Sequence, residues 1–256
     1  MSHDTSSRFD PRGLALPGLV LALWWGATAS GFADTRIVAP PAEVLATALR
    51  EISSGELFEG LLASLGRDLA GFALGSTAGL LLGALLAVSG LADRLVSPSL
   101  HALKQVALFA WIPLISVWLG QDEAARVLFI GLAAFYPVLF NSHEGIRSVT
   151  RELAEVTRVF RFNTRQRITR LILPAAAPQI FAGLHLALIY SWLATIGAEY
   201  FFKATPGVST PLLDGRADFD MAKVLYGMVV VGLVGAALNA IASRLEQRSL
   251  KWRRSR

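Results

Sequence analysis

The spacing of charged residues constrains this chain most, because it leaves six long stretches without Asp, Glu, Lys or Arg. These stretches are residues 13–33, 69–92, 105–121, 127–142, 171–198 and 224–243. A helix needs roughly 17–25 mostly apolar residues to cross the hydrocarbon core of a bilayer. Only 17% of the 256 residues are charged, against about a quarter in soluble domains. The sequence therefore predicts an all-α polytopic membrane protein with about six transmembrane helices.

The third and fourth stretches are the shortest, at 17 and 16 residues. Each is therefore interpreted either as a full crossing or as a buried or re-entrant piece. Pro113 lies within the third stretch and predicts a kink, because proline cannot donate the helical hydrogen bond. The first stretch has 21 residues. It is longer than the core of a signal peptide, about 7–15 residues, and is expected to remain as a membrane anchor.

Lysine and arginine are distributed unevenly between the loops, and this bias predicts the orientation. If the N-terminus is cytoplasmic and all six stretches cross, 17 of the 24 basic residues lie on the cytoplasmic side. An excess of basic residues on that side is the rule for membrane proteins. We therefore expect a multi-pass membrane protein with both termini cytoplasmic. The net charge of +5 reflects this bias and a basic tail rather than nucleic-acid binding.

The chain is expected to form one membrane domain with short flanking segments. Residues 1–56 hold an N-terminal cytoplasmic segment, the first helix and an outer linker with an amphipathic helix over 42–52. Residues 57–246 form the transmembrane domain with five helices, and 247–256 form a basic cytoplasmic tail. The chain has no cysteine, which excludes a thiol nucleophile and a thiolate metal site. No metal site and no catalytic residue are predicted.

Four glycines follow one another at intervals of four residues in the second stretch. They are Gly71, Gly75, Gly79 and Gly83, and helical geometry places them along nearly one face. Small residues on one face let a second helix approach closely. Glycine is also common in membrane helices in general, but four in register favour a packing seam.

The stretch 144–174 carries seven arginines and three glutamates, too many charges for the hydrocarbon. Ile146, Val149, Leu153, Val156 and Phe160 follow helical spacing and predict an amphipathic helix. A turn at 162–164, with Asn163 as N-cap, leads into a second helix over 165–173 that meets the fifth span at Pro174. The apolar stripe of this helix–turn–helix contacts either the lipid surface or another protein.

The segment 155–174, EVTRVFRFNTRQRITRLILP, resembles the EAA loop of type I binding-protein-dependent ABC importer permeases. Glu155 takes the place of the family's glutamate, and Pro174 follows nineteen residues later, as in the family pattern. The ending at 171–174 is similar as well. Asn163 stands where the family often has Ser or Thr.

This loop departs from the family pattern at three positions. Val156 and Thr157 replace two alanines, and Arg161 stands where the family has glycine. Glycine would permit a positive φ angle in the turn. Asn163 tolerates that conformation better than most residues, and it is expected to provide the turn instead.

The resemblance extends from about residue 56 to 253, with similar motifs at 63–72, 112–120, 137–141 and 198–207. The branch that the chain most resembles contains the permeases for aliphatic sulfonates, taurine and nitrate. By this resemblance the chain would be the transmembrane subunit of an ATP-driven importer in the bacterial inner membrane. It would form the path for a small solute, an organic sulfonate or a related small anion.

The resemblance also implies the partners. Two permease copies would form the path, two ATP-binding subunits would dock on the cytoplasmic side, and a periplasmic or surface-anchored substrate-binding protein would deliver the solute. This chain has no Gly-x-x-x-x-Gly-Lys-Ser/Thr pattern to hold a phosphate, so it binds no cofactor and the partner subunits would use ATP. The residues expected at the ATPase contact are Glu155, Val156, Thr157, Phe160, Arg161, Phe162, Asn163, Leu173 and Pro174.

Three residues of the fifth span are candidates for the translocation path. His185 is an ionisable residue inside a span, which marks either a functional site or a histidine hydrogen-bonded between helices. Trp192 is interpreted as packing or as part of the path. Glu199 ends the span, and the simpler expectation for it is a solvated carboxylate at the membrane edge.

Two other classes of protein compete with an importer permease. A secondary carrier driven by an ion gradient often has inverted repeats and paired ionisable groups at mid-membrane. These spans contain almost none, apart from His185 and the edge pair Arg67 and Asp68, and no repeat is visible. The second alternative is a membrane scaffold without transport activity, and only the helix–turn–helix argues against it.

Overall fold

The computed structural model describes residues 15–149, 160–203 and 206–249. Within these ranges all regular structure is helical. The residues divide into two compact units. The first unit contains the residues up to Leu57 together with Pro211–Val229, and the second contains Phe58–Thr210 and the residues from Val230 on.

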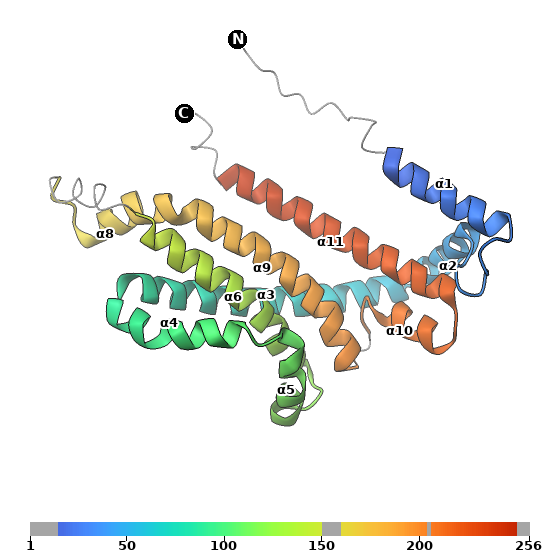
Figure 1. The fold of residues 1–256 in the computed structure, drawn as a ribbon, viewed down its shortest axis with the longest axis horizontal. Coiled ribbons are helices and arrows are strands. Elements are labelled where there is room, and N and C mark those ends of the chain that lie inside the picture. Colours follow the sequence, from blue (N-terminus) through green and yellow to red (C-terminus); the bar gives the residue numbers. More distant parts are fainter. Residues whose placement is uncertain (1–14, 150–159, 204–205, 250–256) are drawn as a thin grey trace, which may run out of the picture. The chain divides into compact units, whose positions relative to one another are not determined.

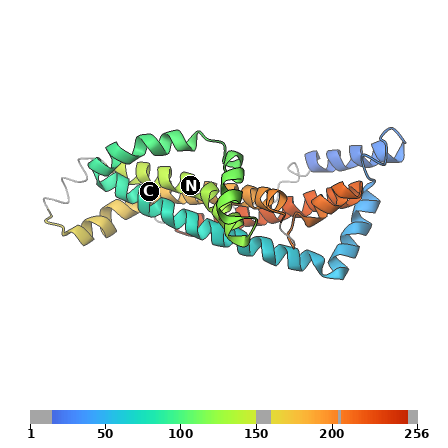
Figure 2. The same cartoon turned by 90° about the horizontal axis from the view of Figure 1, so that it is seen from below.

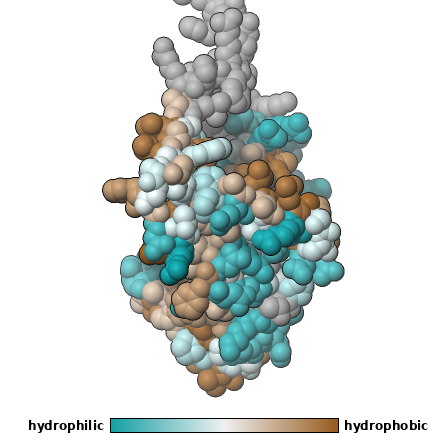
Figure 3. All heavy atoms as spheres, turned by 90° about the vertical axis from the view of Figure 1, so that its right-hand side faces the viewer, coloured by the Kyte–Doolittle hydropathy of each residue, from teal (hydrophilic) through white to brown (hydrophobic). Residues whose placement is uncertain are grey.

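The first unit contains α1 (Ala15–Ala29), α2 (Pro41–Ser54), most of α10 (Thr210–Ala217) and the start of α11 (Met221–Ser249) (Figure 1). The amphipathic helix expected over 42–52 is confirmed as α2, which ends at Gly55 with a left-handed φ of 86°. Lys223 forms ion pairs with Glu51 at 3.7 Å and Asp214 at 3.6 Å. Figure 3 faces the side of Figure 1 on which α2 and α10 lie, and hydrophilic residues cover much of it.

The described part of the first span is α1, an apolar helix of 15 residues that begins at the first described residue. The full length of this span stays a prediction, because residues 13–14 lie outside the described residues. Four other helical runs in the described chain are long and apolar enough to cross a membrane: α3 (Glu56–Val88), α6 (Glu123–Arg147), Thr164–Phe201 and α11. The fourth stretch, which was short in the sequence, thus lies inside a helix of 25 residues.

The four glycines of α3, which we call the glycine seam, show how α3 and α6 run relative to each other. A Cβ atom on Gly71 would meet Ile130, and one on Gly83 would meet the Leu139 carbonyl, so the contacts advance in the same direction along α3 and α6. The two helices are therefore parallel. Since α3 ends where α6 also ends, the chain between them must return to the other end of the bundle.

The return segment is a bent pair of helices, which fits both alternatives for the third stretch, a broken crossing or a re-entrant piece. It consists of α4 (Gly90–Lys104), the short 3₁₀ helix η2 (Leu108–Trp111) and α5 (Ile112–Leu119), with a bend of 98° between the two arms. Figures 1 and 2 both show α4 along the bundle and α5 turning away from it. The chain breaks at residues 105–107, not at Pro113, which lies in the first turn of α5, where no helical hydrogen bond is lost.

The helix α9 (Leu173–Phe201) is antiparallel to α6 and packs closely against it. Gly145 of α6 lies against Gln179, whereas Gly183 of α9 lies against Asn141. The buried core around this pair includes Phe129, Ile130 and Phe202. The bundle thus has two ends. We call the one with the starts of α3 and α6 the Glu199 end, and the other the loop end.

Candidate functional site

The loop end carries part of the predicted ATPase contact. Glu155, Val156 and Thr157 lie outside the described residues. The described part begins with Phe160, whose side chain is 69% exposed, and its ring centroid lies 6.3 Å from that of Phe162. Arg161 and Asn163 are exposed beside them. Phe162 is half-buried, so the tip presents one exposed aromatic ring with a second beside it among polar residues, and an exposed ring of this kind is a candidate contact for another molecule.

Asn163 caps the short helix α8 (Thr164–Arg167) as the sequence predicts. Its Oδ1 atom accepts a hydrogen bond from the Gln166 backbone N–H at 2.8 Å, and the Gln166 side chain accepts one from the Asn163 N–H at 3.0 Å. The expectation that Asn163 provides the positive φ angle is wrong. Its φ is −72°, as an extended cap requires, and Arg161 has a φ of 52° at the family's glycine position.

The second loop helix is not a separate element, which corrects the predicted boundary at Pro174. After α8 the chain forms the π-helical turn η3 (Ile168–Ile172) and continues into α9 without a break. The Leu173 N–H donates to the Ile168 carbonyl five residues earlier. This wider turn precedes Pro174, which lacks an N–H group and lies in the first turn of α9. Leu173 is 54% exposed.

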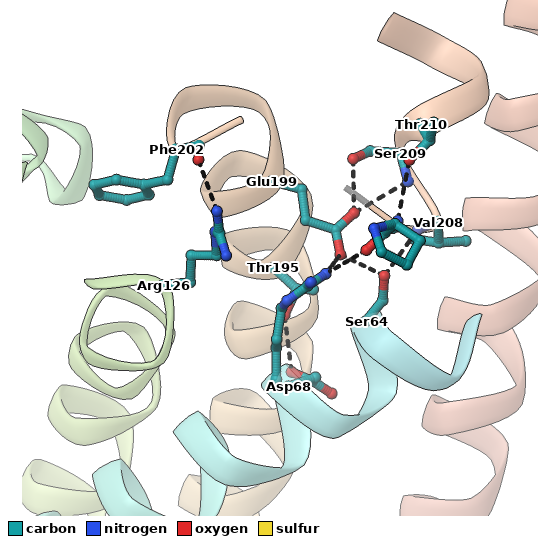
Figure 4. A network of polar contacts seen from close by, with 12 residues as sticks. Ser64, Asp68, Arg126, Thr195, Glu199, Phe202, Val208, Ser209 and Thr210 are labelled. Atoms are coloured by element: carbon teal, nitrogen blue, oxygen red, sulfur yellow. Dashed lines mark hydrogen bonds and ion pairs between the residues drawn. The ribbon is translucent and has the colours of Figure 1, made fainter. Parts of the chain in front are cut away.

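At the opposite end of the bundle the structure buries a carboxylate. Glu199 has no exposed surface, so the expectation of a solvated residue at the membrane edge is wrong. Its oxygens accept hydrogen bonds from the Ser64 hydroxyl, from Arg67 at 3.1 Å, and from the Ser209 N–H and hydroxyl at 3.1 and 2.6 Å (Figure 4). A buried charge is stable only when paired and hydrogen-bonded, and this one has four donors.

Arg67 connects this carboxylate to α6. Its Nε and Nη2 atoms donate to the two Glu123 oxygens at 2.9 Å each, and its Nη1 atom also donates to the Pro206 carbonyl at 2.9 Å. Arg126 donates to Glu123 at 2.7 Å and to the Phe202 carbonyl at 3.0 Å. Two arginines and two glutamates thus join α3, α6, α9 and the segment after Pro206. We call them the ion cluster.

Two glycines let the backbone approach this cluster. A Cβ atom on Gly207 would lie 2.6 Å from the Glu199 carboxylate, and one on Gly60 would lie 2.8 Å from the Gly207 carbonyl. The Val208 N–H donates to Ser64 at 2.8 Å. One turn along α3, the fully buried Asp68 accepts a hydrogen bond from Thr195 at 3.3 Å. The ends of three helices are therefore fixed by polar contacts rather than by apolar packing alone.

His185 faces the C-terminal half of α11, and Trp192 faces its middle. The His185 ring nitrogens lie 2.7 Å from Asn239 Oδ1 and 3.2 Å from Glu246 Oε2, and the Trp192 indole donates to the Val231 carbonyl at 3.3 Å. Both residues line a cavity of about 380 Å³. The structure therefore brings these two path candidates together but places the third, Glu199, in the ion cluster.

A larger cavity, of about 520 Å³, lies where α4 breaks. Lys104 and the residues 106–109 line it from the broken helix, Tyr136 and Asn141 from α6, and Tyr190 from α9. Sequence reasoning did not select these residues. The sequence did contain one signal for this cavity: Lys104 directly precedes an uncharged stretch whose length is at the lower limit for a transmembrane helix.

Sequence reasoning also did not select the residues around Glu199. Arg67 was noted only as a charge at a membrane edge. The signal was present in the predicted topology, which places Arg67 at the same membrane face as Glu123 and Glu199. Nothing in the local sequence indicates that the three side chains meet, because Arg67 and Glu199 are 132 residues apart.

Comparison with known proteins gives consistent matches. The sequence pattern of the family described as "Binding-protein-dependent transport system inner membrane component" matches residues 75–254. A putative aliphatic sulfonates transport permease protein of Bacillus subtilis is 36% identical over 244 residues, which cover 95% of this chain and 88% of the relative. The protein of the same name in Escherichia coli is 32% identical over 93% of this chain and 90% of its own. A bicarbonate transport system permease protein of Synechococcus elongatus is 29% identical over 75% of this chain and 69% of its own.

Proposed function

The chain belongs to the family of binding-protein-dependent transport system inner membrane components, and on this premise we propose that it forms, as two copies, the path by which an importer moves a small organic anion. As a member of this family it is a multi-pass inner-membrane subunit and not itself an enzyme. The family implies ATP-binding and substrate-binding partners. Two ATP-binding subunits, one substrate-binding protein and the annular lipid complete the proposed assembly.

The observation that supports the substrate class is the nearly full-length match to two permeases named for aliphatic sulfonates. The relative named for bicarbonate also transports an anion by its name, although its match is shorter. An alkanesulfonate carries one negative charge on an apolar chain. We therefore propose an organic sulfonate as the solute and bicarbonate as the anion to compare with it.

The proposed ATPase contact is the tip of the loop end. Phe160 and Phe162 present two neighbouring rings, and Arg165 and Arg167 follow on exposed positions of α8. The capping box at Asn163 fixes the start of α8, so the tip has a defined shape for a partner to recognise. On ATP-driven closure of its partners the bundle would switch as a rigid body between inward-open and outward-open states.

Uptake into proteoliposomes tests this proposal. The permease is reconstituted with its ATP-binding subunits, the substrate-binding protein is added outside, and labelled butanesulfonate or bicarbonate is supplied with or without internal ATP. We expect butanesulfonate uptake only with ATP and the binding protein. Uptake driven instead by a proton or sodium gradient without ATP would support the secondary carrier and contradict the proposal.

The loop has its own test in the same vesicles. Phe162→Ala and Glu155→Arg are expected to uncouple ATP hydrolysis from uptake, so that hydrolysis no longer drives transport. Normal uptake in both variants would show that this loop does not couple ATP hydrolysis to transport.

A further inference from the structure

The cavity beside the break in α4 lies near the middle of the bundle. Its α6 wall includes Tyr136 and Phe140, close to the midpoint of Glu123–Arg147, and its α9 wall includes Leu186 and Tyr190, close to the midpoint of Leu173–Phe201. Both helices are long enough to cross a bilayer. The cavity is therefore at mid-membrane depth whichever end of the bundle faces the cytoplasm.

A short part of the backbone that borders this cavity is not helical. Residues 105–107 connect α4 to η2 outside any helix, and both 106 and 107 line the cavity. A non-helical backbone at membrane depth is tolerated only where protein buries it or where it lines a water-filled cavity. Interrupted helices at mid-membrane are where transporters commonly bind their solutes. The break is therefore better explained by a binding site than by a packing defect.

Lys104 gives this cavity a positive charge. Among the described residues that line it, Lys104 is the only one with a formal charge, and none of the described carboxylates forms an ion pair with it. Its Nζ atom lies 4.8 Å from the centroid of the Phe140 ring, a weak cation–π contact. An ionisable residue at mid-membrane is expensive and by default indicates function.

The rest of the wall suits the carbon chain of a small molecule. Val106, Leu108, Phe109, Trp111, Leu132 and Leu193 contribute apolar surface. Tyr136, Tyr190 and Asn141 add a few polar groups, although Asn141 already donates to the Pro137 carbonyl at 2.8 Å and accepts from Gln179 at 3.0 Å. A mostly apolar cavity of this size with one charge is typical of a small-molecule site.

We propose that this cavity binds the transported solute on its way through the membrane, as an organic anion with a short alkyl chain. The Lys104 ammonium faces the anionic headgroup, and the aromatic and aliphatic wall contacts the chain. The inference rests on the proposed function, because it assigns a site in this subunit to the solute of the importer. It differs from the path predicted through His185, Trp192 and Glu199.

The test uses the complete importer in proteoliposomes with Lys104→Met, which keeps the length of the side chain and removes its charge. Lys104→Arg keeps the charge, and Lys203→Met removes a charge from an exposed loop residue as the matched control. Initial rates of butanesulfonate uptake are measured at subsaturating concentration together with ATP hydrolysis. Lys104 is exposed to the cavity, and loss of its charge as the partner of the anion is expected to lower uptake by about tenfold.

The proposal expects this loss in Lys104→Met, with largely retained uptake in Lys104→Arg and Lys203→Met and with an intact complex in all three variants. Wild-type uptake by Lys104→Met would overturn it. So would a Lys104→Met complex that loses a subunit in size-exclusion chromatography, because the cavity would then be an assembly contact. If wild type takes up neither anion, the proposed function itself fails, an outcome that is distinguishable from these two.

Discussion

Charged side chains are paired with one another at one end of the α3–α6–α9 bundle and exposed at the other. At the Glu199 end two arginines and two glutamates satisfy one another, and Glu199 has no exposed surface. At the loop end Arg161, Arg165 and Arg167 are exposed beside a ring, Phe160, that is 69% exposed. The first end pairs its charges within this chain, whereas the second presents groups that a partner can cover.

Under the proposed function, this difference gives each end its own role: the Glu199 end holds the helices together, and the loop end receives the motion of the ATP-binding subunit. Polar contacts at the Glu199 end join three helices and the segment after Pro206. In the described residues the loop tip continues through α8 and the π-helical turn η3 directly into α9. Under the proposed function, a push on the tip would be carried along this helical run toward the ion cluster.

Removing the central carboxylate should have the largest effect on stability. Glu199→Ala leaves Arg67 buried with one partner fewer and leaves Ser64 and Ser209 without their acceptor. Breaking a buried ion pair in this way costs about 3–5 kcal/mol. Thermal unfolding of the protein in detergent should show a large drop in Tm. A Tm equal to wild type would show that the cluster does not hold the helices together.

Crowding the glycine seam should have the next largest effect. In Gly75→Ala the new methyl group would lie 2.1 Å from the Gly131 carbonyl, so α3 and α6 must separate. Overpacking of this kind costs about 1–3 kcal/mol. Gly66→Ala is the matched control on the same helix, because its methyl group would meet no atom within 4 Å. Equal unfolding temperatures for the two variants would show that Gly75 does not lie at a close contact between α3 and α6.

A smaller and local effect is expected at the start of α8. Asn163→Ala removes the side-chain half of the capping box, which typically lowers helix stability by about 1 kcal/mol. Hydrogen exchange should accelerate at the first backbone amides of α8 and remain unchanged at the Glu199 end. Exchange that accelerates equally at both ends would mean that the loop is not a local unit.

The smallest effect on stability is expected for the exposed ring. Phe160→Ala should change the free energy of unfolding by no more than about 0.5 kcal/mol, as for most surface substitutions. It should nevertheless reduce uptake and the retention of the ATP-binding subunits. A variant that unfolds easily would place Phe160 in the core of this chain rather than at an interface.

The sequence predicted those features that arise from local patterns. The amphipathic helix at 42–52, the glycines along one face of α3 and the cap at Asn163 each follow from spacing within one helix. The break at 105–107 could not be predicted in the same way. Pro113 suggested a kink inside the third span, but proline is equally suited to the first turn of a helix, where it lies.

Contacts between distant residues account for the other error at the candidate site. Glu199 ends an apolar span, and a carboxylate there is expected to face water unless a partner is known. Its partners Ser64 and Arg67 are 135 and 132 residues away. Arg161 illustrates the opposite case, because residue preference favoured Asn163 for the positive φ angle but the cap required Asn163 to be extended.

The central claim is that the loop end binds an ATP-binding subunit, and co-purification tests it most directly. Tagged wild type and a variant without residues 156–164 are purified from native membranes, and the associated proteins are identified by mass spectrometry. The account predicts an ATP-binding subunit with wild type and its loss with the deletion, while thermal unfolding shows the Glu199 end still folded. Equal recovery of that subunit with both proteins, or its absence from wild type, would contradict the account.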